Sequence, residues 1–444
     1  MAELIYDKKG RLIFTKEMKK DYTLLMPMML PIHFGFLQNV FHLHGYNAEL
    51  LDTIGHEIIE EGLRDVHNDI CYPALLTTGQ LMHAIKSGKY DVHKTAFIMS
   101  QTGGGCRASN YIHLIRKTLK NHNMDYIPVI SFNAVGLEKN PGFKMTLKMA
   151  VQFLYAVIYG DLLMWLSNQT KPYEVNTGDT QKVLDKWVEE INVQMKSSKN
   201  FLPKKAKKNF EGIVRDFAEI KLDMKPKVKV GVVGEIYIKY AALGNNNLED
   251  FLHSEDAEVV VPSLLDFVLY AMYNTVHDYE LYKVKFIMSK VMKFALNAIY
   301  SLQAKVTHSI KKHSTFRPMQ KFEHIRALVK GYVSTGNKMG EGWLLTAEML
   351  ELIDCGVDNI ICTQPFGCLP NHVVGKGMIR KIKKNFPDSN IVAIDYDSGA
   401  TKINQENRIK LMLSTARKNL EKQTAKADIS ADKQADKTHC LKAM

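Results

Sequence analysis

Four cysteines lie in three segments that are far apart in the sequence, and their neighbours suit a metal site. Cys71 lies in NDICYPA, Cys106 in QTGGGCRASNY, and Cys362 and Cys368 in CTQPFGCLPNHV. Thiolates that folding gathers from distant loops are the ligands that an iron–sulfur cluster in an enzyme pocket needs. We therefore expect the function of the chain to lie where these segments meet.

The residues leave three other roles for a cysteine open. Structural zinc sites generally have two close pairs such as C-x2-C, whereas only Cys362 and Cys368 are near each other here, at a wider spacing. A nucleophilic thiol is a second role, because Cys106 is expected at a helix N-terminus, where the dipole favours a thiolate, and His113 follows on that helix. A small buried hydrophobe is the third role, which suits Cys355 in the helical run LTAEMLELIDCG. Taken together, the residues favour an iron–sulfur site.

A turn of three glycines, Gly103, Gly104 and Gly105, precedes Cys106. Residues without a Cβ let backbone N–H groups approach cluster sulfides closely, and such hydrogen bonds stabilise added negative charge. The turn follows a predicted buried strand, 96–101, and opens the predicted helix ASNYIHLIRKTLKN. Open α/β sheets place their ligands at this end of their strands.

Length and composition set the class of protein. A chain of 444 residues that is 46% hydrophobic can bury a sizeable core and should divide into two or three domains. Six cysteines without a disulfide framework, and no apolar signal before MAELIYDKKG, predict a cytoplasmic protein. The apolar stretch that starts at Phe153 is interrupted by Gly160 and Asp161 and is shorter than the roughly 20 residues that span a bilayer. No membrane segment is expected.

The positive charge of the chain raises the question of nucleic-acid binding. The net charge is +12, and the run MKSSKNFLPKKAKKNF, Met195–Phe210, is the most basic segment. It has little aromatic interleaving and no zinc-finger, helix-turn-helix or RNP-type motif accompanies it, so we interpret it as a solvated helical face. A weaker interpretation is that the basic surface attracts a nucleotide-like substrate or an acidic redox partner. We expect no nucleic-acid partner.

Alternating apolar runs and helical patterns predict an α/β protein. We expect two Rossmann-like or flavodoxin-like parallel-sheet domains joined by a helical connecting segment. The long helical stretch 264–315 is rich in Met, Tyr and Phe, which we attribute to core packing. The expected strands are 23–29, 96–101, 127–133, 228–236, 257–263, 358–364 and 390–397. The expected domains are an N-terminal α/β domain at 1–175, a helical linker or lid at 176–227, a C-terminal α/β domain at 228–420 and a disordered tail at 421–444, in which Cys440 is not expected to be a ligand.

Long strings of the sequence resemble the 2-hydroxyacyl-CoA dehydratase superfamily, in the dehydratase- or activase-related branch that is related to the double-cubane cluster proteins. The resemblance extends from about Phe14 to Ala416. The strings that carry it are NDICYPALLTTGQ, FIMSQTGGGCRASNYIHLIRKTLK, YGD at Tyr159–Asp161, KPYE at Lys171–Glu174, VGEIYIKY, GEGWLLTAEM, ICTQPFGCLPNHVVGKGMIR and NIVAIDYDSGATKINQENRIKLML.

The resemblance implies an oxygen-sensitive iron–sulfur lyase. Dehydratases of this family hold a [4Fe-4S] cluster on three cysteines and leave the fourth iron open to an acyl-CoA substrate, and a separate ATP-hydrolysing activase supplies one electron. Cys71, Cys106 and Cys368 stand at the ligand positions of the family motifs. Cys362 is an additional cysteine, for which a fourth ligand, a second cluster of a double cubane, or a structural thiol are all open roles. A homo- or heterodimer is also implied.

Several polar residues should lie near the expected cluster. Glu235 and Glu341 are candidates for acid–base catalysis, and Arg107 and Gln364, together with the three glycines, are candidates for binding the cofactor. Each also has a structural alternative. Arg107 then pairs with a carboxylate, and Glu341 caps the helix of GEGWLLTAEM.

Two alternative functions remain beside the lyase. Double-cubane relatives are ATP-dependent reductases of small molecules, and a non-catalytic subunit could relay electrons from an activase to another protein. The segment IDYDSGATK, Ile394–Lys402, superficially resembles an activase phosphate loop, but we interpret it as a strand-to-loop junction. The ATPase is therefore expected to be another polypeptide.

Overall fold

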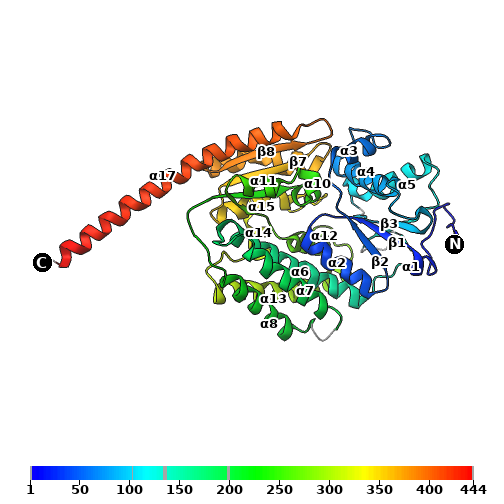
Figure 1. Ribbon diagram of the computed structural model, residues 1–444, viewed down its shortest axis with the longest axis horizontal. Coiled ribbons are helices and arrows are strands. Elements are labelled where there is room, and N and C mark those ends of the chain that lie inside the picture. Colours follow the sequence, from blue (N-terminus) through cyan, green and yellow to red (C-terminus); the bar gives the residue numbers. More distant parts are fainter. Residues whose placement is uncertain (1–2, 103, 134–137, 198–200, 443–444) are drawn as a thin grey trace.

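The computed structural model describes residues 3–102, 104–133, 138–197 and 201–442, with side chains described up to residue 425. Within these ranges the chain forms two four-stranded parallel sheets, each covered by helices, with a layer of long helices beside them (Figure 1). The predicted α/β class with two parallel-sheet domains is confirmed.

The N-terminal sheet has the strand order β2-β1-β3-β4, and all neighbouring strands are parallel. Its strands are β1 Thr23–Pro27, β2 Asn47–Leu51, β3 Thr95–Ser100 and β4 Val129–Phe132. The sequence predicts all of these except β2. That strand, NAELL, lies at the sheet edge and has no β-branched residue, so it lacks the composition typical of strands.

The C-terminal sheet repeats the same arrangement, with the order β6-β5-β7-β8 and parallel neighbours throughout. Its strands are β5 Val228–Gly234, β6 Ala257–Val260, β7 Asn359–Pro365 and β8 Asn390–Tyr396. All four were predicted, because parallel strands that are buried on both faces are nearly continuous apolar runs.

Helices around the N-terminal sheet position two of the cysteine segments. They are α1 Met18–Asp21, α2 Pro31–Leu43, α3 His56–Leu63, α4 Tyr72–Lys86 and α5 Tyr111–Asn121. Helix α4 is buried along most of its length and packs closely on α3. A Cβ on Gly79 would lie 2.1 Å from the carbonyl oxygen of Ile58, so glycine is required at this crossing.

A layer of long helices lies against both sheets (Figure 1). It contains α6 Leu147–Thr170, α7 Asp179–Gln194, α8 Pro203–Ala218, α12 Leu264–Tyr282 and α13 Phe286–His313. The segment 176–227, for which a linker or lid is predicted, supplies α7 and α8, which pack against α6, α2 and α13. In the basic run, Lys204, Lys207 and Lys208 face solvent while Phe210 is buried, as expected for a solvated helical face.

Asp161 of α6 is fully buried and links this helix to α2 and to α12. Its carboxylate accepts hydrogen bonds from the backbone N–H groups of Leu264 and Leu265, at 2.8 and 2.9 Å, at the start of α12. It also bonds the Ser263 hydroxyl and His33 Nε2 of α2, each at 2.9 Å. Four partners offset the cost of burying this carboxylate.

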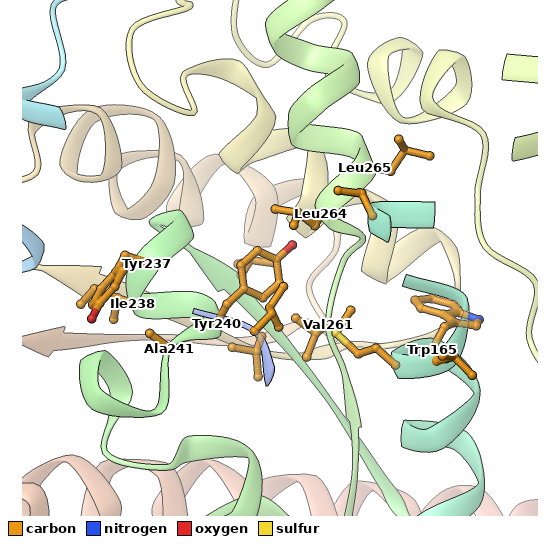
Figure 2. Packing of buried hydrophobic residues seen from close by; sticks show 14 of the residues in the cluster. Trp165, Tyr237, Ile238, Tyr240, Ala241, Val261, Leu264 and Leu265 are labelled. Atoms are coloured by element: carbon orange, nitrogen blue, oxygen red, sulfur yellow. The ribbon is translucent and has the colours of Figure 1, made fainter. Parts of the chain in front are cut away.

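The core continues from this helical layer into the C-terminal sheet. Figure 2 shows Tyr240 of α9, Ile236–Tyr240, with its ring beside Leu264 and Val261. The Tyr240 hydroxyl donates to the carbonyl oxygen of Pro262 at 2.8 Å, which satisfies its polar end inside the core. Helix α9 is therefore fixed between the sheet and the helical layer.

The remaining helices surround the C-terminal sheet and include the last helix of the chain. They are α10 Ala242–Asn245, α11 Leu248–Ser254, α14 Phe322–Leu328, α15 Trp343–Asp354, α16 Ile379–Asn385 and α17 Lys402–Lys442. Helix α17 extends well beyond the body of the protein (Figure 1), whereas the sequence predicts a disordered tail from 421. Residues up to Ala416 bury Ile409, Met412 and Leu413, while the segment after 421 is rich in helix-forming Lys and Ala and lacks an apolar stripe. The side chain of Cys440 lies outside the described residues.

One helical segment in the described ranges, Leu147–Tyr173, is long and apolar enough to cross a membrane. Inside the protein, however, 83% of its apolar window is buried. This is the behaviour of a core helix in a globular domain.

Candidate functional site

Cys71 and the loop after β7 meet directly, although nearly 300 residues separate them in sequence. Cys71 is buried and is the N-cap residue of α4, as the position of Pro73 predicts. The backbone N–H of Tyr72 donates to the carbonyl oxygen of Phe366 at 3.1 Å. Gly367 has φ +75°, and a Cβ there would lie 3.0 Å from the Cys71 nitrogen. A glycine is thus needed where the two cysteine segments touch.

The Cys106 segment meets a third loop, residues 334–342, which leads into α15. The N–H of Gly105 points at the sulfur of Met339 at 3.3 Å. Gly340 has φ +59°, and a Cβ there would lie 3.3 Å from Pro370 and 3.7 Å from Cys106 Sγ. This loop therefore contacts both the glycine turn and the segment that follows Cys368.

Cys71 lies within electrostatic reach of Cys106 and of Cys368, and the carboxyl group of Glu235 acts on all three thiols. Burial raises the pKa of all three thiols, that of Cys106 to about 11. The negative charge of Glu235 adds to the rise at each thiol, and that of Glu341 adds to it at Cys106 and Cys368. No basic side chain is among the main influences on these three thiols. They are therefore protonated at neutral pH in the absence of a metal, which argues against a nucleophilic thiolate.

Glu235 and Glu341 are both buried and both bind the start of α9. Glu235 caps this helix by accepting from the N–H of Ile238 at 2.9 Å, and Glu341 Oε1 accepts from the N–H of Ile236 at 2.9 Å. The expectation that Glu341 caps its own helix, α15, is wrong, because its carboxylate turns toward the neighbouring chain segment instead. Glu341 Oε2 has no hydrogen-bond partner among the described residues.

Burial raises the pKa of both carboxyl groups, so each keeps its proton to a higher pH than an exposed carboxyl group does. Burial and the neighbouring Glu341 raise the pKa of Glu235 to about 8. Burial likewise raises the pKa of Glu341. Paired buried carboxyl groups with raised pKa values are a common feature of sites that transfer protons.

Lys239 is a buried cation beside this pair that sequence reasoning missed. Its Nζ forms a 2.7 Å ion pair with Glu348 of α15, and both side chains are almost fully inaccessible. The positive charge of Lys239 opposes the rise in pKa of Glu235, Glu341 and Glu348. The four-residue spacing of Glu235 and Lys239 was the available signal, since such residues share a helix face.

Tyr111 is a second residue that the sequence did not single out. Its hydroxyl lies 3.3 Å from Cys71 Sγ, and its ring is buried at the start of α5. Burial, followed by the charges of Cys71 and Glu235, raises the pKa of Tyr111 well above its usual value. It is therefore neutral, and either the Tyr111 hydroxyl or the Cys71 thiol can be the donor in this contact. Its position five residues after Cys106 was the only signal.

Cys362 is not brought to the other three cysteines. It lies inside β7, fully buried between Val233 of β5 and Ala393 of β8, with its sulfur 3.7 Å from Asn371 Oδ1. Burial raises the pKa of its thiol to about 12, with smaller effects from Glu348 and Asp395, and no other cysteine contributes. Cys355 ends α15 next to Gly356, as its helical pattern predicts.

The residues predicted to bind the cofactor differ in their exposure to solvent. Gln364 is fully buried at the end of β7 and bonds His372 through its amide nitrogen, while Gly104 and Gly105 are exposed. Arg107 is also exposed, and none of the ion pairs in the described ranges includes it, so its expected carboxylate partner is not found. Gly103 lies outside the described residues. His113, the candidate partner of a nucleophilic Cys106, is exposed on α5.

A mononuclear metal site is not preformed in the part of the chain that the structure describes. No group of three or more His, Cys, Asp or Glu side chains there converges closely enough to hold one ion. A zinc ion bound at about 2.3 Å draws its thiolates to within roughly 4 Å of one another.

Comparison with known proteins adds no assignment: no family model matches the chain, and no curated protein matches it.

Proposed function

We propose that this chain is an iron–sulfur enzyme similar to the 2-hydroxyacyl-CoA dehydratases, with a [4Fe-4S] cluster on Cys71, Cys106 and Cys368. The cluster would lie between the two α/β domains, and the substrate would be an acyl-CoA-like molecule. The observation that carries the proposal is that Cys71 lies within electrostatic reach of both Cys106 and Cys368, from the two halves of the chain, and that the buried Glu235 acts on all three thiols.

The donor set suits a cluster better than the alternatives. Each thiolate of a cubane binds a different iron, so its ligands are spread farther apart than those of a single ion. Cys71 is within electrostatic reach of Cys106 and of Cys368, as thiols on different irons of one cubane would be. A bound metal deprotonates its thiol ligands outright, so the raised pKa values of the free thiols do not oppose metal binding.

The side chains around the three thiols suggest how the site would work. The cluster would supply single-electron chemistry and an open coordination position for the substrate. Glu235, with a pKa of about 8, holds a proton near neutral pH and can deliver it to a departing hydroxyl group, which leaves as water. The charge of Glu341 acts on Glu235 and helps it to keep this proton, and the Tyr111 hydroxyl can donate to a Cys71 thiolate.

The electron donor in this proposal is a separate ATP-hydrolysing activase. No P-loop string G-x4-G-K-[ST] occurs in the sequence, and the segment Ile394–Lys402 connects β8 to α17. The proposal also includes a cytoplasmic location and a homo- or heterodimer, in keeping with the family resemblance.

An ATP-dependent reductase of the double-cubane type, or a non-catalytic electron relay, is the second candidate. It requires a second cluster or a cluster closed by four cysteines. The position of Cys362 inside β7, away from the other thiols, supports a single cluster with three protein ligands instead.

Anaerobic purification followed by iron and sulfide analysis and EPR tests these functions together. We expect brown protein with about four irons per chain and broad absorption near roughly 400 nm. About eight irons would support the double cubane. Colourless protein with stoichiometric zinc would contradict both. The Cys355→Ser variant is the matched control, because this cysteine lies outside the group and should not change the iron content.

A further inference from the structure

The turn between α12 and α13 carries an exposed apolar surface, which we call the α12–α13 tip and define as residues 281–294. Ile287 and Phe294 are 77% and 79% exposed, and Tyr282 and Val291 are more than half exposed. The Met and aromatic residues of 264–315 were attributed to core packing. That interpretation is wrong for the tip, where these side chains face solvent. Exposed apolar patches of this kind commonly mark interaction sites.

Helix α13 is apolar on two opposite faces near its start. Ser289, Leu296 and Ile299 are buried against the body of the protein. Ile287, Val291 and Phe294 follow the spacing i, i+4, i+7 and therefore form a second stripe, which is exposed. The body of the protein covers the inner apolar face of α13. No residue of the described chain covers the outer stripe, which is therefore available to a partner.

The charges of the α12–α13 tip are all positive. Lys283, Lys285, Lys290 and Lys293 lie among the apolar residues, and no Asp or Glu occurs between 281 and 294. None of these lysines forms an ion pair within the described residues; Lys290, for example, lies over the Phe286 ring at 5.4 Å. A second copy meeting the same surface would oppose lysines to lysines, which disfavours a symmetric dimer here. An acidic partner is complementary.

One loop connects this tip to the cysteine site. The loop 334–342 binds the end of α12 through the Lys338–Asp278 ion pair and through the Thr335 hydroxyl, 3.0 Å from His277 Nε2. The same loop then brings Met339 to Gly105, as described above. Met339 itself is half exposed. A lipid surface would suit the lysines and apolar residues, but it gives no reason for this connection to the cysteine site.

We propose that the α12–α13 tip is the docking surface for the electron donor, a protein whose docking face is apolar and bordered by carboxylates. The inference rests on the proposed function. One electron would pass from the reduced donor to the oxidised cluster, with no bond made or broken. The donor would lie against the loop 334–342 and hence close to Cys106.

The test compares reduction by a docked donor with reduction by a small molecule. The anaerobic protein is mixed with a dehydratase-type activase and MgATP, or with titanium(III) citrate, and the loss of cluster absorbance is followed. The variants are Ile287→Ser/Phe294→Ser and Lys285→Glu/Lys290→Glu. The matched control is Leu411→Ser/Lys418→Glu on α17, where Leu411 is 72% exposed and both positions lie away from the tip.

We expect both tip variants to be reduced by the activase at least about tenfold more slowly than wild type at low salt, and titanium(III) citrate to reduce all variants equally. The control should stay within about twofold of wild type. Equal activase rates in wild type and tip variants overturn the inference. Wild-type protein with iron that titanium(III) reduces but the activase does not overturns the inference and the proposed partner, whereas protein without iron overturns the proposed function.

Two further measurements exclude the other occupants. Sedimentation equilibrium would reveal a wild-type dimer that the Ile287→Ser/Phe294→Ser variant dissociates, and cosedimentation with phosphatidylglycerol–phosphatidylcholine vesicles would reveal membrane binding that the same variant loses. Either result assigns the tip to a second copy or to a lipid surface and overturns the inference. We expect the tip variants to change neither measurement.

Discussion

The two sheets have the same strand order but contribute different chemistry to the site. The N-terminal half provides Cys71 at a helix start and Cys106 in a glycine turn, and its partly buried carboxylate Glu138 is paired with Arg116 and Arg11. The C-terminal half provides one thiol and the two carboxyl groups of Glu235 and Glu341. Among the described residues of that half, Lys239 is the single buried lysine near these carboxyl groups. Its positive charge does not cancel the effect of burial, so both pKa values stay raised.

The difference shows that topology alone does not set chemistry. In the N-terminal half, two guanidinium groups hold the pKa of Glu138 below its usual range despite partial burial. In the C-terminal half, burial dominates and raises the pKa of Glu235 to about 8. The first arrangement stabilises structure, whereas the second can hold and release a proton near neutral pH. The predictions below test this division.

The largest expected effect is on the metal content. Replacing Cys71, Cys106 or Cys368 with Ser should each lower the iron bound after anaerobic reconstitution by at least about tenfold, because a cluster with three protein ligands has no spare thiolate. Iron analysis and EPR measure the result, with Cys355→Ser as the control. Full iron content in all three variants would show that the thiols contributed by the two halves do not share a cluster.

The sequence predicted most of the strands that position this site. Strands β1, β3, β4 and β5–β8 were predicted from apolar runs, and Cys71 and Cys106 were placed at helix starts from Pro73 and the glycine turn. The edge strand β2 was missed because it has no β-branched residue. The local spacings after Cys106 and Glu235 marked Tyr111 and Lys239 but not their partners Cys71 and Glu348, because these contacts depend on how distant segments pack.

The distinction between Cys362 and Cys368 also needed the structure. Both cysteines belong to one motif, but Cys362 falls within the strand and Cys368 in the loop after it. A boundary shift of a few residues therefore decides which thiol reaches the site. Likewise, the exposed stripe of α13 has the same composition as a core helix, so only the packing reveals that nothing in the described chain covers it.

The second effect concerns the one buried cation of the C-terminal half. Lys239→Met should destabilise the protein by about 3–5 kcal/mol, because it leaves Glu348 buried without its partner. The double variant Lys239→Met/Glu348→Leu should recover most of this loss, since it removes both charges. Urea unfolding measures both changes. Equal destabilisation of the single and double variants would indicate a packing defect instead of an unpaired charge.

A third prediction separates the two halves by pH. The folded pKa of Glu235 is raised from 4.5 to about 8, so folded protein binds more protons than unfolded protein in this window, and stability falls as pH rises through it. Glu138 has a lowered folded pKa, so its contribution is present above pH 4.5 and is lost as pH falls below that value.

In metal-free wild-type protein, the free energy of unfolding should fall as pH rises from 4.5 to 8. In the Glu235→Gln variant this fall should be smaller by on the order of a few kcal/mol. Glu138→Gln should instead reduce the fall in the free energy of unfolding below pH 4.5. The reduction should be roughly 1 kcal/mol, because the ion pair of Glu138 is partly exposed. Thermal unfolding across this pH range distinguishes them. If both variants altered the same side of the profile, the two carboxyl environments would not differ as described.

The smallest expected effect is at Cys362, six residues from the proposed ligand Cys368. Cys362→Ala should leave the iron content and the EPR spectrum unchanged, because the sulfur lies inside β7 and no other cysteine acts on its thiol. Removing a fully buried sulfur should cost only about 1 kcal/mol, since the cavity is small and Asn371 keeps its 2.9 Å hydrogen bond to the carbonyl oxygen of Thr363. Loss of half the iron would instead indicate a second cluster that uses Cys362. An altered EPR spectrum with full iron would place this thiol beside the cluster, and either result would mean that the C-terminal half contributes a second thiol, in addition to Cys368.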